Sequence, residues 1–107
     1  MEELEGQIFD IISHSGTARA DLYDALEAVR SNDYAKSDKL LAEASTEMTL
    51  AHNVQTKLIT ADLAGKTNIS LLLIHAQDQL MTTMSEQTLI EQMIKMQKDI
   101  NALKRVE

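Results

Sequence analysis

Small and apolar side chains recur along the first thirty residues at alternating intervals of four and three, and this spacing restricts the possible folds more than any other feature. Residues spaced in this way share one face of an α-helix, whereas a strand would require a period of two. The members of the stripe are Leu4, Ile8, Ile11, Ser15, Ala18, Leu22, Ala25 and Val29. The sequence therefore predicts an amphipathic helix over about residues 2–30.

Two further stripes predict helices over about residues 33–64 and 69–104. The second stripe contains Leu41, Ala44, Met48, Ala51, Leu58 and Ala61, and the third contains Leu73, Leu80, Met84, Leu89, Met93, Met96, Ile100 and Leu103. Ser31-Asn32-Asp33 suits the start of the second helix, and Gly65 suits the position after its end. Short links of this kind make sequential helices antiparallel neighbours.

The composition agrees with an all-α fold. The chain has no proline and three glycines among 107 residues, so few residues oppose long helices. This length fits one domain, residues 1–107, built as an antiparallel three-helix bundle. Gly16 falls inside the first stripe, where it is either a tolerated glycine or the mark of a kink or a close helix approach.

The start of the third helix is apolar on nearly every side, over residues 69–74. A three-helix bundle buries one stripe on each helix, so a second face here needs another cover. We expect that cover to be another subunit, with the third helix at the interface.

Charge and composition exclude several classes of function. The formal net charge of −7, the absence of a basic block and the three aromatic residues argue against nucleic-acid binding. The acidic opening of the chain is unlike a secretory signal, and no apolar run approaches the ~20 residues of a membrane span. We therefore expect a cytoplasmic protein with no direct membrane insertion. The lack of cysteine removes disulfides and thiolate zinc sites.

One group of polar residues interrupts the apolar pattern of the predicted third helix. His75, Asp78, Gln79 and Thr82 stand at i, i+3, i+4 and i+7, so all four share one helix face. The group contains a nucleophilic or ligating imidazole, but the spacing equally fits an interface histidine that is hydrogen bonded to Asp78. Periodicity leaves both interpretations open.

The other two histidines, His14 and His52, are interpreted as structural, since an isolated helical histidine is commonly partly buried and hydrogen bonded. Neither a His-Glu-x-x-His nor a Glu-x-x-His pattern occurs, so a zinc or di-iron site within one chain is not expected. Ordinary core packing is the expected role of four methionines at helical spacing, Met81, Met84, Met93 and Met96.

The segment Ile74-His75-Ala76-Gln77-Asp78-Gln79-Leu80-Met81-Thr82 resembles the signature of the lactose/cellobiose-type enzyme IIA proteins of the bacterial phosphoenolpyruvate-dependent sugar phosphotransferase system. Ser15-Gly16-Thr17-Ala18-Arg19, Ala51-His52-Asn53-Val54-Gln55-Thr56 and the acidic opening match the same family in register. The resemblance covers essentially the whole chain. One departure is Gln79, where the family usually has histidine.

This resemblance implies a homotrimer that carries phosphoryl groups. His75 would accept a phosphoryl group from the carrier HPr and pass it to a cysteine of a cognate IIB protein, which serves a membrane IIC permease. The His75-Ala76 pair resembles the cellobiose and chitobiose branch more than the lactose branch. Gln79 and Thr82 would donate hydrogen bonds to the phosphoryl oxygens.

The resemblance also implies that three copies of Asp78 meet at the trimer axis around a shared divalent cation, with Mg²⁺ favoured. The alternative is that Asp78 orients the His75 ring within its own helix. For the whole protein, the competing class is a non-catalytic helical adaptor, or a regulatory member of the same family.

Overall fold

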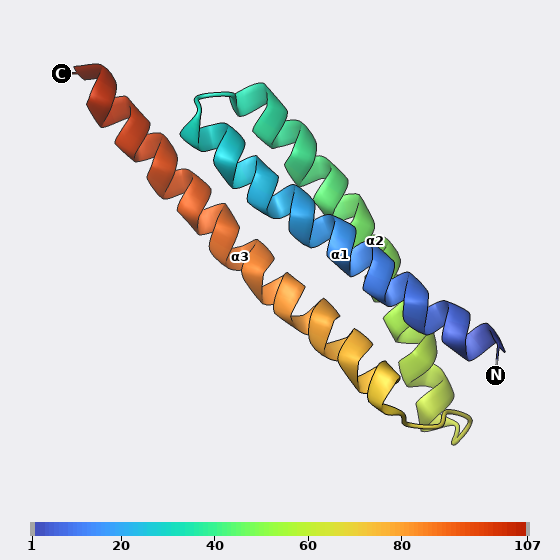
Figure 1. The fold of residues 1–107 in the computed structure, drawn as a ribbon. Helices are drawn as coiled ribbons and strands as arrows, with labels where there is room; N and C mark the ends of the chain where they lie inside the picture. The colour runs from blue at the N-terminus through green and yellow to red at the C-terminus, as the bar shows by residue number, and fades with distance from the viewer. Residues whose placement is uncertain (1, 107) are drawn as a thin grey trace.

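Three long helices and two short links make up residues 2–106 (Figure 1). This computed structural model describes residues 2–106, with side chains described over residues 3–104. The helices are α1 (Glu2–Arg30), α2 (Tyr34–Leu63) and α3 (Leu71–Val106), and residues 2–106 contain no strand. The all-α class is therefore confirmed. Residues 1 and 107 of the expected domain lie outside the described part.

The link between α1 and α2 is a tight turn closed by backbone hydrogen bonds. Asn32 adopts a positive φ of 63°, and its N–H donates to the carbonyl of Val29 at 3.0 Å. The N–H of Asp33 donates to the carbonyl of Ala28 at 2.8 Å, which completes a Schellman motif. The Asp33 carboxylate then accepts a hydrogen bond from the backbone N–H of Lys36 and caps α2, as the sequence predicts.

The link between α2 and α3 also begins with a Schellman motif, and it ends with a serine that caps α3. Gly65 has a φ of 71°, and the N–H of Lys66 donates to the carbonyl of Ala61 at 2.9 Å. Glycine suits this left-handed position because it has no Cβ. The Ser70 hydroxyl accepts a hydrogen bond from the backbone N–H of Leu73 at 3.1 Å, so α3 begins two residues later than predicted.

Helix α1 is the centre of the packing. Its predicted stripe is buried from Ile8 to Val29, and Leu4 is half-buried. Helix α2 packs antiparallel along one side of α1, and α3 packs parallel along another side, so both contact α1 far more than they contact each other (Figure 1). The expectation that α2 and α3 are close neighbours is therefore wrong over most of their length, because α3 turns away from α2 to follow α1.

A hydrogen bond between side chains joins α2 and α3 near the start of α3. Gln55 is buried, and its amide donates to the side-chain carbonyl of Gln77 at 2.6 Å. At the opposite end of the molecule, the Asn101 amide donates to the carbonyl of Val29 at 2.9 Å and to the Tyr34 hydroxyl at 3.0 Å. These bonds fix both ends of α3 against the α1–α2 pair.

The predicted core stripe of α3 is correct only at its beginning. Leu73 and Leu80 are buried, but the residues that continue the buried face are Thr83, Ile90 and Ile94. The remaining predicted core residues are exposed, namely Met84, Leu89, Met93, Met96, Ile100 and Leu103. Within the subunit, the core role expected for the methionines, including Met81, is therefore wrong. The physical reason is that α1 covers one side of α3 while α2 lies too far away to cover a second.

None of the described helices combines the length and the apolar character that crossing a bilayer requires.

Replacing Gly65 by alanine is expected to lower the free energy of unfolding by about 1 kcal/mol, because a left-handed φ brings Cβ too close to the backbone. Gly6 is the matched control: it lies in α1, and no atom lies within 4 Å of the position of an added Cβ. Gly6→Ala is expected to raise the same free energy by up to about 1 kcal/mol. Urea denaturation followed by circular dichroism measures both, and two shifts of the same sign would contradict this account of the turn.

Candidate functional site

The imidazole of His75 is exposed near the amino end of α3. It borders a shallow hollow whose other lining residues are Leu71 and Leu72, and both of these leucines are exposed. A helical side chain leans toward the amino end of its helix, so the ring lies over the first turn. That turn contains no acidic residue, and the unpaired N–H groups there carry partial positive charge. A negative group on this imidazole is therefore electrostatically favoured.

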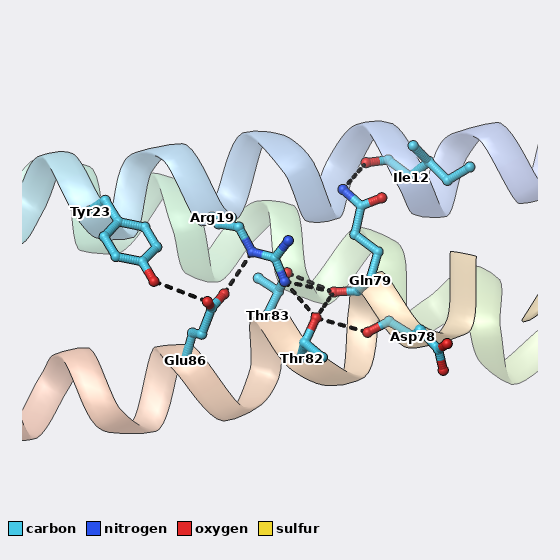
Figure 2. Close-up of polar contacts among 8 residues, drawn as sticks. All are labelled: Ile12, Arg19, Tyr23, Asp78, Gln79, Thr82, Thr83 and Glu86. Atoms are coloured by element: carbon cyan, nitrogen blue, oxygen red, sulfur yellow. Dashed lines mark hydrogen bonds and ion pairs between the residues drawn. The ribbon is translucent and has the colours of Figure 1, made fainter. Parts of the chain in front are cut away.

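The carboxylate of Asp78 is also exposed, but it faces a different hollow. Asp78 lines a cavity of about 250 Å³ together with Ile74, Gln77 and, from the end of α2, Asp62. In Figure 2 the carboxylate points away from Gln79 and Thr82. Within residues 2–106, no hydrogen bond joins this carboxylate to the His75 ring.

Gln79 reaches across to α1. Its amide nitrogen donates to the backbone carbonyl of Ile12 at 3.3 Å (Figure 2). Gly16 gives the Gln79 amide room at this point, because a Cβ at that position would lie only 3.3 Å from the same nitrogen. Of the two readings left open for Gly16, the structure supports the close approach. Gln79 has a second amide N–H that this bond does not use.

The Thr82 hydroxyl is already engaged on both sides. It donates to the carbonyl of Asp78 at 2.8 Å, and it accepts a hydrogen bond from Nη2 of Arg19 at 2.5 Å. Thr82 also lies seven residues beyond His75, which corresponds to about 10 Å along the helix axis.

Arg19 is the centre of a polar network that the sequence analysis did not identify. Its Nε donates to the Glu86 carboxylate at 2.6 Å, and the Tyr23 hydroxyl donates to the other oxygen of that carboxylate at 2.9 Å (Figure 2). This hydrogen bond and the negative charge of Glu86 raise the pKa of Tyr23 above its usual value. The available signal was Arg19 itself, a positive charge inside one of the quoted segments.

The remaining two histidines differ from each other. Nδ1 of His14 lies 2.5 Å from a carboxylate oxygen of Glu47, and both side chains are partly buried, which confirms the structural interpretation. His52 is exposed, and its ring makes no hydrogen bond within the described residues. The expected partial burial of His52 is therefore wrong, because its face of α2 turns away from α1.

Of the four predicted site residues, the structure directs Gln79 and Thr82 to α1 and leaves His75 and Asp78 open to solvent. No group of three His, Cys, Asp or Glu side chains within residues 3–104 could hold a metal ion. The carboxylate of Asp78 is a suitable Mg²⁺ ligand by its chemistry, but the described residues place no further pair of His, Cys, Asp or Glu side chains around it.

The chain that carries the exposed His75 also matches a known protein family over most of its length. Residues 6–98 match the family described as "PTS system, Lactose/Cellobiose specific IIA subunit". The chain therefore belongs to the lactose/cellobiose-specific IIA family of the sugar phosphotransferase system (PTS).

Individual relatives agree with this membership. The chain is 39% identical to the N,N'-diacetylchitobiose-specific EIIA component of Escherichia coli K12 over 102 residues, which cover 94% of this chain and 88% of that protein. The fold is similar to the PTS cellobiose-specific enzyme IIA of Bacillus anthracis, with a TM-score of 0.87, 35% identity and coverage of 92% and 91% of the two chains. It is also similar to a chain of the Escherichia coli IIA(Chitobiose)–HPr complex, with a TM-score of 0.81, 37% identity and coverage of 94% and 99%.

The contact between Gly16 and Gln79 is expected to appear as coupling between two substitutions. Gly16→Ala gains up to about 1 kcal/mol of helix propensity, but its Cβ crowds the Gln79 amide. In a Gln79→Ala background the crowding is gone, so Gly16→Ala should be more stabilising there than in the parent chain. A double-mutant cycle by urea denaturation measures the difference. Equal effects of Gly16→Ala in both backgrounds would show that the contact carries no energy.

Proposed function

We propose that the protein is a phosphocarrier that accepts a phosphoryl group on His75 from phosphorylated HPr and passes it to a cysteine of a cognate IIB protein. The observation that carries this proposal is the exposed imidazole of His75 at the amino end of α3, in a chain of the lactose/cellobiose IIA family. The relative whose structure includes HPr supports the choice of donor. The site of action is the cytoplasm.

The chemistry requires little beyond an accessible neutral imidazole. A ring nitrogen of His75 attacks the phosphorus of the donor phosphohistidine, a new N–P bond forms, and the N–P bond of the donor breaks. In the second step the thiolate of IIB attacks the same phosphorus and the His75 N–P bond breaks. The uncompensated amino end of α3 stabilises the phosphoryl charge while His75 carries it.

The supporting roles of Gln79 and Thr82 stay predictions. Gln79 retains one amide N–H for a phosphoryl oxygen while the other bonds to Ile12. The Thr82 hydroxyl proton is directed to the carbonyl of Asp78, so Thr82 must release that bond before it can donate to a phosphoryl group.

The proposed transport substrate of the system is a β-linked disaccharide of the chitobiose or cellobiose type. Relatives with these two specificities are 39% and 35% identical to this chain. The sugar is selected by the IIC permease, which the carrier serves indirectly through IIB.

We further propose that three subunits associate through α3. The support is the row of exposed apolar side chains on that helix, which a solitary subunit leaves in water at a cost in free energy. The row consists of Met81, Met84, Leu89, Met93, Met96, Ile100 and Leu103. The exposed apolar residues near the start of α3, Ile69, Leu71 and Ile74, would extend the interface.

A divalent cation, Mg²⁺ by preference, would be held by Asp78 from each of the three subunits. The exposed, hydrogen-bond-free carboxylate supports this arrangement better than it supports the ring-orienting alternative. When bound, the cation supplies charge neutralisation among carboxylates that otherwise repel one another.

His75→Ala is expected to abolish phosphorylation while leaving the helical content intact, because the ring is exposed and alanine is a good helix former. The measurement is the intact mass after incubation with phosphoenolpyruvate, enzyme I and HPr. His14→Ala and His52→Ala are the matched controls and should retain the label. The linkage should be labile to acid, as a phosphorus–nitrogen bond is. A label that persists in His75→Ala would refute the assignment, and an unlabelled parent chain would favour the adaptor class.

Asp78→Leu is expected to preserve or strengthen the trimer and to remove its response to divalent cations, because the variant no longer brings three carboxylates together. Light scattering with Mg²⁺ and with a chelator measures the assembly.

Met93→Asp is the contrasting variant, since a charge in the proposed interface should disperse the subunits in either buffer while the helical content is retained. A parent chain that stays monomeric at micromolar concentration would contradict the trimer. A cation response that survives in Asp78→Leu would contradict the axial site.

A further inference from the structure

We propose that Arg19 is a positioning residue for phosphoryl transfer, which fixes the rotation of α3 about its own axis and thereby the direction of the His75 imidazole. This inference rests on the proposed function. Arg19 on α1 makes two short charge-assisted contacts with α3, to Glu86 at 2.6 Å and to Thr82 at 2.5 Å.

Arg19 does not itself touch the reacting group. Its partners Thr82 and Glu86 lie seven and eleven residues beyond His75, or about 10 and 16 Å along the helix axis. The His75 ring leans in the opposite direction, toward the amino end of α3. A guanidinium held at this level can therefore act on the reaction only through α3.

The guanidinium has the geometry that such a role requires. Its planar fork donates in two directions at once, to the carboxylate of Glu86 through Nε and to the hydroxyl of Thr82 through Nη2, with a longer approach of 3.5 Å to the carbonyl of Gln79. Two contacts on successive turns resist rotation of a helix, which a single contact cannot do. Lysine has one ammonium group and cannot reproduce the fork.

The network continues toward His75 through Gln79. The Gln79 side chain is fixed to the carbonyl of Ile12 at 3.3 Å, and its backbone N–H bonds to the carbonyl of His75, as α-helix geometry requires. Arg19 and Gln79 therefore hold the two turns that follow His75 against α1 (Figure 2).

The sensitivity of the site to rotation follows from helix dimensions. Side-chain tips lie about 5–6 Å from the helix axis, so a rotation of only ~10° displaces a tip by about 1 Å. A displacement of this size can cost up to about a hundredfold in rate when two reacting atoms must be aligned.

The experiment measures single-turnover phosphorylation of His75 by phosphorylated HPr over a range of donor concentrations, in the full-length parent chain and in Arg19→Lys. Arg19→Lys is expected to lower the rate constant at saturating donor by about tenfold and to change the half-saturating concentration less than about twofold. Arg30→Lys is the matched control, because it alters an exposed Arg–Glu pair at the far end of α1, and it should transfer at the parent rate.

A double-mutant cycle separates positioning from simple stabilisation. If Arg19 acts through Thr82, Arg19→Lys should have little further effect on the rate constant in a Thr82→Val background. Additive effects of Arg19→Lys and Thr82→Val, or a parent-like rate constant in Arg19→Lys with only a lower melting temperature, would overturn the positioning role.

The outcomes for the two proposals are distinct. A parent chain that takes no label overturns the proposed function, and the role of Arg19 falls with it. A parent chain that is labelled on His75, together with an equally fast Arg19→Lys, overturns the role of Arg19 alone.

Discussion

The packing of α1 against both other helices is the interaction on which the rest of the structure depends. Its buried stripe alternates large side chains such as Ile11 and Leu22 with small ones such as Ala18 and Ala25, all of them fully buried. The small residues let two helices approach α1 on different sides, and the large ones fill the space between them. Because α3 packs mainly against α1 and touches α2 little, one of its faces stays apolar and open, and His75 stays accessible beside it. The accessibility of His75 and the proposed assembly surface thus have the same origin.

The His75 ring is exposed, whereas the helix turns that follow it are held firmly against α1. The His75 ring lies in solvent and makes no hydrogen bond within the described residues, which leaves it free for the partners of the proposed transfer. The turns behind it are held by Gln79 and Arg19, whose partners lie on α1. A similar separation is common where a reactive group must be both reachable and aligned, because contacts to the reactive group itself would compete with its partners.

The sequence was sufficient for the helices, the α1 core and the family, since each depends on local periodicity or on contiguous motifs. It was insufficient for α3 beyond Leu80, where apolar residues occupy two faces of the helix. The predicted buried stripe, which contains the methionines, is the exposed one. Ile90 and Ile94 are buried instead because α1, and not α2, is the neighbour of α3. The network around Arg19 could not be predicted either, because its partners lie more than sixty residues away and depend on the parallel alignment of α1 and α3.

That parallel alignment also affects how the chain folds. The α1–α2 pair meets across a tight turn, so its contacts close a short loop and can form early. The contacts that support the site join residues 60 or more positions apart, namely Gln79 to Ile12 and Arg19 to Thr82 and Glu86. The whole of α2 lies between these residues in the sequence. Contacts of such high sequence separation form late. A nascent or partly folded chain therefore presents a complete helical hairpin before the turns that follow His75 are held against α1.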